Sequence, residues 1–296
     1  MKIGYPCINR SIDCKSDKTF RLKSYSNERL VETVDNNLNC LEEILKYNVD
    51  NNFLFFRISS DLVPFASHSI CNFNWQNYFK SKFEKIGSFI DENDIRISMH
   101  PDQFIVLNSK NNLVVKRSIK ELQYHSDILD LMGLKNDAKI QLHIGGAYGD
   151  KKSSIKRFIN VYRSLSENIK SRLVIENDDH IFNINDCLNL SFKTDIPILF
   201  DYLHHLTYNN NEDVDYCLKS IEQTWNNVDG LPMVDYSSQK IGGKPGSHAL
   251  SLDKRDFQNF IEISKPYDFD IMLEIKDKEK SAIDALGVVK NDFRFY

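Results

Sequence analysis

A regular alternation of strand-like and helix-like segments runs along the chain and constrains its fold more than any other feature. Short apolar segments are separated by longer segments in which apolar residues recur at helical spacing. Strands that alternate with helices in this way form parallel sheets with both faces covered. The strand-like segments span residues 2–7, 53–60, 95–99, 139–144, 172–176, 196–201, 231–235 and 270–274, and the helix-like segments span residues 27–47, 74–93, 113–132, 153–170, 183–190, 213–227 and 253–264.

Eight strand-like segments that alternate with helices without a linker-like break predict a single α/β domain over residues 1–296, a (β/α)8 TIM barrel rather than a doubly wound sheet. Barrels of this class reach 296 residues as one domain. Ser153 is the expected N-cap of the fourth helix. No apolar run approaches the roughly 20 residues of a membrane span, and the N-terminus lacks a signal-peptide core. We therefore expect a cytoplasmic protein without membrane contact.

Cysteine content and net charge exclude some classes of protein. The six cysteines lie far apart without a CxxC pair, which favours reduced, mostly buried thiols over a disulfide framework or a zinc knuckle. A net charge of −4 gives no overall nucleic-acid footprint, so any polyanionic partner must be bound by local patches or by metal. The cysteines are Cys7, Cys14, Cys40, Cys71, Cys187 and Cys217.

Metal-capable side chains stand at the C-terminal ends of six strand-like segments. In a barrel these ends meet on one face, where barrel enzymes carry their active sites. Imidazoles and carboxylates are ligands of divalent cations, and several adjacent carboxylates remain ionised only with cations between them. We therefore predict a multinuclear metal site at the C-terminal face of the strands, formed by His100, His143, Glu176, Asp201, His204, Asp235 and Glu274.

Each of these residues alone has a structural alternative. A strand-end histidine is often a hydrogen-bonded structural residue, and a strand-end aspartate often caps the next helix. The repetition at the same relative position in successive units favours ligands. Two other histidines do not share this position and are expected to be structural: His125 within a predicted helix and His180 in a polar turn.

Several long motifs resemble those of the UV damage endonuclease family over nearly the whole chain. They are Gly4-Tyr5-Pro6-Cys7 with Asn9, Thr19 to Leu22, Phe56 to Ser60 with Pro64 to His68, Ser98 to Phe104, Leu173 to Asp179, and Asp270 to Glu274. The resemblance implies a barrel related to endonuclease IV. It also implies two or three divalent ions, typically manganese, and a nick in the DNA backbone on the 5′ side of UV photoproducts.

The resemblance also implies roles for single residues. It adds His248 to the metal ligands predicted above and places Tyr5, Asn9 and His68 in the pocket. Glu176, Tyr5 and His68 are the catalytic candidates, and Glu176 is expected to bridge two ions. Gln103 and Phe104 match the pair that probes the damaged dinucleotide and fills the gap left when the lesion leaves the stack.

Two positions depart from the family pattern. The family commonly carries a carboxylated lysine after the seventh strand and a histidine two residues later, where this chain has Met233 and Asp235. Aspartate ligates a hard cation, whereas a thioether suits neither manganese nor magnesium. We therefore expect weakened metal binding near His204 and His248, beside a complete two-metal core.

The expected partner is UV-damaged double-stranded DNA, cut by metal-assisted phosphodiester hydrolysis. Cationic residues on loops of the same face are candidates for holding its backbone. No obligatory protein partner is indicated. Two alternatives stay open: a metal-dependent sugar isomerase or epimerase of the same barrel class, and a damaged-DNA binding protein with impaired catalysis. The cationic candidates include Arg10, Arg21, Lys151 and Lys244.

Overall fold

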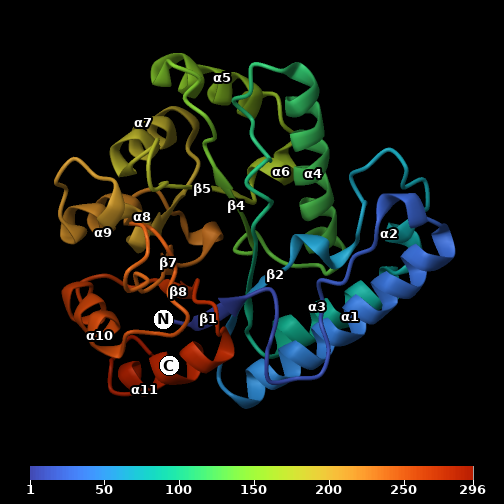
Figure 1. The fold of residues 1–296 in the computed structure, drawn as a ribbon, viewed down its shortest axis with the longest axis horizontal. Coiled ribbons are helices and arrows are strands. Elements are labelled where there is room, and N and C mark those ends of the chain that lie inside the picture. Colours follow the sequence, from blue (N-terminus) through green and yellow to red (C-terminus); the bar gives the residue numbers. More distant parts are fainter. Residues whose placement is uncertain (296) are drawn as a thin grey trace.

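Eight parallel strands close into a barrel in the order in which they occur in the chain. The computed structural model describes residues 1–295, and each strand pairs with its neighbours in sequence, with β1 closing on β8 (Figure 1). The prediction of a TIM barrel is therefore confirmed. The strands are β1 (Ile3–Pro6), β2 (Phe55–Ile58), β3 (Arg96–Met99), β4 (Lys139–His143), β5 (Leu173–Glu176), β6 (Ile198–Asp201), β7 (Met233–Tyr236) and β8 (Asp270–Leu273).

Helices surround the barrel and bury one face each against the strands. In α1, Leu30, Val34, Leu38 and Leu45 lie on one stripe and are buried, and Ser26 caps the first turn by accepting a hydrogen bond from the Arg29 amide. The helices are α1 (Asn27–Asp50), α2 (Trp75–Tyr78), α3 (Lys80–Glu92), α4 (Asn112–Leu131), α5 (Lys151–Arg163), α6 (Glu167–Lys170), α7 (Ile184–Thr194), α8 (Tyr202–Thr207), α9 (Val214–Glu222), α10 (Lys254–Ile263) and α11 (Glu279–Val289).

Two predicted helices are divided in the structure. Residues 74–93 form α2 and α3, because the buried Phe79 leaves helical geometry between them. Residues 153–170 form α5 and α6, because the Ser164 hydroxyl bonds to the Val161 carbonyl and the backbone of Ser166 is extended. The predicted N-cap Ser153 is also wrong, since the Asp150 side chain caps α5.

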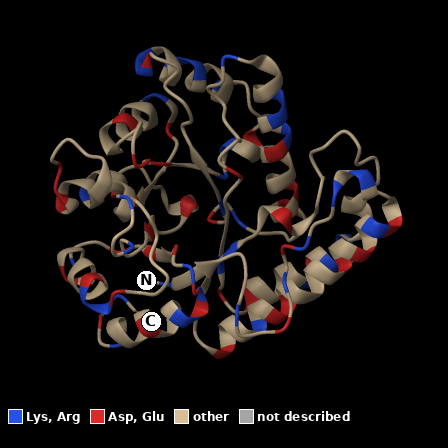
Figure 2. Ribbon diagram, in the orientation of Figure 1, with Lys and Arg blue, Asp and Glu red and all other residues tan. Residues whose placement is uncertain are grey.

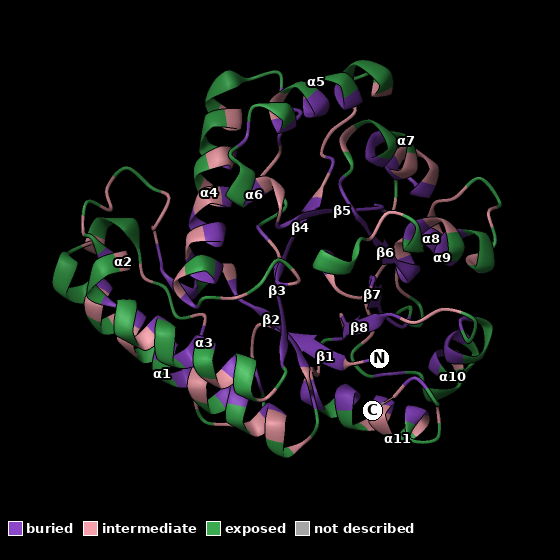
Figure 3. Ribbon diagram, turned by 180° about the vertical axis from the view of Figure 1, so that it is seen from behind, coloured by how far each residue is buried: buried purple, intermediate pink, exposed green. Residues whose placement is uncertain are grey.

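The barrel interior is layered. Phe55, Val174, Leu199, Met233 and Met272 form one buried apolar cluster, which is separate from the larger core between strands and helices. The strands themselves are buried almost throughout (Figure 3). Side chains two residues apart on a strand point to the same side. The next layer towards the C-terminal face is therefore occupied by polar groups: Arg57, Glu176, Asp201, Asp235 and Glu274.

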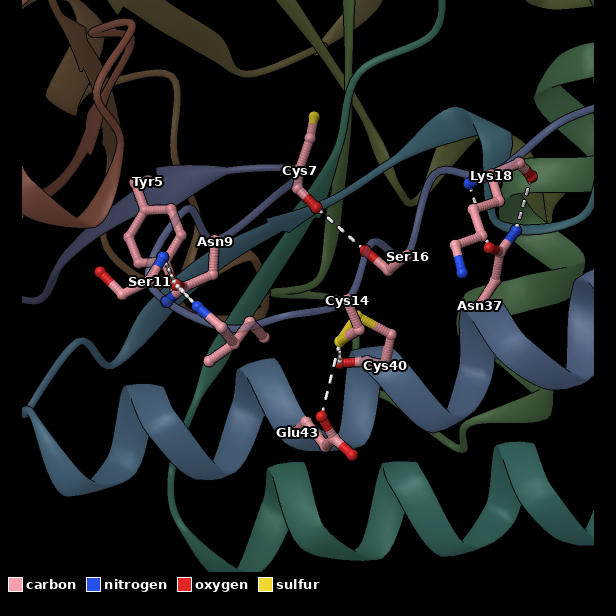
Figure 4. Close-up of a disulfide and its surroundings, with 11 residues drawn as sticks. Tyr5, Cys7, Asn9, Ser11, Cys14, Ser16, Lys18, Asn37, Cys40 and Glu43 are labelled. Carbon is pink, nitrogen blue, oxygen red and sulfur yellow. Dashed lines mark hydrogen bonds between the residues drawn. A yellow bond between two sulfur atoms is a disulfide. The ribbon is translucent and has the colours of Figure 1, made fainter.

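A disulfide joins Cys14, in the loop after β1, to Cys40 in α1, with 5.8 Å between the Cα atoms (Figure 4). The expectation of six reduced thiols is therefore wrong for this pair. Spacing in the sequence does not reveal that the loop folds back onto α1, which brings the two Cα atoms within bridging distance. The other four cysteines are free, and Cys187 and Cys217 are buried.

Charged residues of both signs are distributed over the outer helices (Figure 2). Between residues 1 and 295, every helix is too short or too polar to span a bilayer.

Candidate metal centre

The ends of β3 to β6 bring three histidines around one carboxylate. His143 and Glu176 are directly paired in register across β4 and β5. Potential ligand atoms of His100, His143 and Glu176 lie within 4.8 Å of one another, and so do those of Glu176, Asp201 and His204. The two groups share Glu176, so the predicted ligands of these four strands meet on one face of the barrel.

The two oxygens of Glu176 face different groups. Oε2 lies 3.5 Å from Nε2 of His100 and 3.8 Å from Nε2 of His143. Oε1 lies 3.2 Å from Nδ1 of His204. A carboxylate with one oxygen in each of two ligand groups has the geometry of a bridge between two ions.

Local structure places His204 beside Asp201. The Asp201 side chain caps α8 by accepting a hydrogen bond of 2.7 Å from the His204 amide, so one turn of helix returns the imidazole to its own cap. Asn177 holds the Asp201 backbone with two hydrogen bonds of 2.9 and 3.0 Å. Asp201 therefore caps α8 and is also placed to bind a metal ion, whereas the sequence presented these two roles as alternatives.

The electrostatics of the two groups differ. Burial lowers the pKa of His100 to about 4, which keeps its imidazole neutral and able to donate a lone pair. Burial opposes charge on His204 as well, but Asp201 and Glu176 outweigh it and raise the pKa of His204 to about 11. The carboxylates of the second group thus favour positive charge at this position, which a bound cation would supply in place of the proton on His204.

A third group consists of carboxylates. Ligand atoms of Asp201, Asp235 and Glu274 lie within 4.8 Å of one another, and Asp201 and Asp235 are paired across β6 and β7. The Arg57 guanidinium enters this group and forms ion pairs with Asp235 and Glu274. Burial would raise the pKa of Glu274, but Arg57 lowers it to about 2.

His248 lies at the edge of these groups. Its Nδ1 atom is 2.6 Å from the Glu274 carbonyl, and its ring centroid lies 6.3 Å from that of His204. Among residues 1–295 it belongs to none of the three-ligand groups. Met233 belongs to the buried apolar cluster, one layer below the ligand groups. Its side chain therefore does not complete a metal site with His204 or His248.

A cleft of about 350 Å³ opens above the first group. His100, His143, His248 and Glu274 line it together with Gln103. Phe104 follows Gln103 in the loop after β3 and is 72% exposed, which excludes core packing as its role.

The remaining pocket candidates, Tyr5, Asn9 and His68, have their contacts outside the ligand groups. Tyr5 is fully buried, and its hydroxyl donates a hydrogen bond of 2.5 Å to Asn48. The same hydroxyl accepts a hydrogen bond of 2.8 Å from Asn9 (Figure 4). The Asn9 side-chain oxygen accepts from the Ser11 amide, so Asn9 holds the loop after β1. His68 is exposed and packs edge-on against Phe65.

The cationic candidates differ in their freedom. Lys151 is tied to Asp186 by an ion pair of 2.5 Å, and the Nε of Arg10 donates to the Lys276 carbonyl. Arg21 and Lys244 are exposed, on the loops after β1 and β7. These two side chains are therefore the freer candidates for contact with a polyanion.

Sequence reasoning missed Arg57 and Gln141. Arg57 is the one polar side chain of the apolar strand β2, which is a signal of a buried polar network, whereas Gln141 shares β4 with Lys139 and His143 and carries no such signal.

The two histidines set aside differ. His125 is buried, and its Nδ1 donates a hydrogen bond of 2.7 Å to the Glu121 carbonyl, which is a structural contact. His180 is exposed and forms a further candidate metal group with Asp178 and Asp179, so its expected structural role stays a prediction.

Comparison with known proteins gives full-length matches. The profile of the family described as UV-endonuclease UvdE matches residues 1–291. A UV DNA damage endonuclease of Clostridium perfringens is 42% identical over 295 residues, which are 98% of this chain and 71% of that protein. One of Bacillus cereus strain G9842 is 31% identical over 98% of this chain and 96% of its own length.

Solved structures agree with these matches. The crystal structure of SacUVDE is 47% identical, covers 98% of both chains and superimposes with a TM-score of 0.94. A D-psicose 3-epimerase from Clostridium cellulolyticum is 11% identical, with a TM-score of 0.57 over 86% of this chain and 92% of its own, and shares the fold alone.

Proposed function

This chain belongs to the UV-endonuclease UvdE family and is a UV DNA damage endonuclease, and we propose a role for each part of its site. The proposed reaction is hydrolysis of the phosphodiester bond on the 5′ side of a UV photoproduct in double-stranded DNA. The observation that supports it best is the position of Glu176, with one oxygen in each of two ligand groups.

The residues of both groups fit divalent ions. The Nε2 atoms of His100 and His143 face Glu176, and the low pKa of His100 keeps its imidazole available as a ligand. We assign one ion to His100, His143 and Glu176 and a second to Glu176, Asp201 and His204, with Glu274 and His248 beside them. Manganese is the proposed metal. When bound, such ions neutralise charge on the scissile phosphate and activate water for in-line attack.

The protein itself recognises and positions the DNA. We propose that Phe104 and Gln103 enter the stack at the lesion, where damaged bases cost least to unstack. Arg21 and Lys244 extend from loops on the same face and would contact backbone phosphates. Tyr5 receives a positioning role, because its hydroxyl is buried between Asn9 and Asn48 and supports the loop after β1.

The test is incision of irradiated and unirradiated duplex, with manganese, with chelator and with the Glu176→Gln variant. We expect nicks only where lesion, metal and the Glu176 carboxylate are all present. Equal cutting of both duplexes would refute lesion recognition, and an unaffected Glu176→Gln enzyme would refute the bridging role. Binding of irradiated duplex without incision at any divalent metal would instead indicate a damage-binding protein.

A further inference from the structure

Arg57 lies inside the barrel at the level of the third ligand group. The residue is 3% exposed, and its Nη2 atom donates to both oxygens of Asp235, at 2.7 and 2.9 Å. The same atom donates a hydrogen bond of 2.6 Å to Gln141, and Nη1 donates one to Glu274. A guanidinium is charged at every working pH, so this group already contains a permanent cation.

Asp235 is committed to protein partners. It is fully buried, and Oδ2 accepts from Gln141 at 2.7 Å in addition to Arg57. Removing any of these contacts would leave a buried polar group unpaired. Gln141 also donates to Glu176, an assigned ligand, so Arg57 is what distinguishes Asp235: an additional divalent ion on Asp235 would face the positive charge of the guanidinium.

The layer beneath this ion pair offers no other counter-charge for Asp235. Phe55 and Met233 precede Arg57 and Asp235 by two residues on their strands and lie in the buried apolar cluster. The carboxylates of the first two groups differ in this respect, because histidines face them rather than a guanidinium. A guanidinium thus faces the carboxylates at the ends of β7 and β8, whereas histidines face those at the ends of β5 and β6.

We infer that Arg57 takes the place of a third metal ion, so that the centre binds two divalent ions per chain and Asp235 is a positioning residue for Arg57 rather than a ligand. Arg57 in turn fixes one oxygen of Glu274, which lies in the same group as Asp201. The inference rests on the proposed metal-dependent function, and it assigns a different role to a carboxylate that the sequence placed among the ligands.

The test counts ions and needs no cleavage. The protein is loaded with manganese, freed of excess by gel filtration and analysed by inductively coupled plasma mass spectrometry. We expect two manganese ions per chain in the natural protein and in Asp235→Asn. The matched variant Asp201→Asn makes the same chemical change at an assigned ligand and should lower the count to about one. Three ions in the natural protein, or loss of an ion in Asp235→Asn, would overturn the inference.

A second pair of variants removes the guanidinium. Arg57→Met leaves Asp235 and Glu274 without their cation, and we expect its count to rise from two to three; a count that stays at two would show that Arg57 does not exclude the ion. If that variant does not fold, Arg57→Met/Asp235→Met removes the buried pair as a unit, and two ions are expected. Loss of an ion there would contradict the inference. A protein that binds two ions but cuts no DNA would refute only the proposed function.

Discussion

The Nδ1 atom of His204 lies 3.2 Å from Oε1 of Glu176, on the opposite side of the carboxylate from the first histidine pair. The short helix α8 produces this contact, since it begins at the Asp201 cap and returns the imidazole towards β5. One buried carboxylate therefore joins two ligand groups whose histidines come from three different βα units.

We expect Glu176→Gln to lower both metal content and incision. The amide keeps the volume of the side chain but removes the negative charge that both groups share, so manganese content should fall and incision should drop at least about a hundredfold. The comparison is with Glu84→Gln on the outer face of α3, where the side chain is 56% exposed. Metal content equal to that of Glu84→Gln would argue against a bridging carboxylate.

Removal of metal should abolish incision and reduce thermal stability. Without cations, Asp201 and Glu176 remain as buried neighbours, and burial already raises the pKa of Asp201 to about 8. Because ions that bind only the folded state stabilise it, the melting temperature should fall with chelator and return with manganese. A melting temperature that does not respond to either reagent would indicate that these groups hold no ion.

Phe104→Ala should reduce preference for irradiated duplex by about tenfold while metal content stays unchanged, since stacking on an aromatic ring contributes about 1–3 kcal/mol per base. Binding to irradiated and unirradiated duplex measures the preference. Phe192→Ala is the matched control, because Phe192 is 88% exposed in the last turn of α7 and does not line the cleft. Equal preference in the two variants would remove Phe104 from lesion recognition.

Much of the fold follows from the sequence because each βα unit carries its own signals. The apolar stripe of α1 and the buried run of β2 are local patterns, and polar residues at successive strand ends indicate one face. The helix break at Phe79 and the Cys14–Cys40 bridge depend on contacts between segments that sequence spacing does not describe. The pairing of Arg57 with Asp235 joins residues 178 positions apart, so only closure of the barrel reveals it.

The disulfide should contribute to stability. Cys14 and Cys40 are 26 residues apart in the sequence, and closing a loop of this length stabilises a fold by about 3.5 kcal/mol in the chain-entropy model. Cys14→Ser/Cys40→Ser should lower the free energy of unfolding by that amount in urea titrations, whereas Cys71→Ser, at a free cysteine, should change it little. Thiol titration of the denatured, unreduced protein should find four thiols of six. Six thiols would exclude the bridge.

His125 should make the protein less stable as the pH falls through a defined window. Burial lowers the pKa of this imidazole from 6.5 to about 4, so the unfolded chain takes up a proton before the folded one. Its contribution is fully present above pH 6.5 and is lost as the pH falls to about 4, by up to about 3 kcal/mol. We expect His125→Gln to reduce the pH dependence of urea unfolding across this window. If His125→Gln shows the same pH dependence as the natural protein, the acid sensitivity comes from other groups and the buried imidazole contributes none of it.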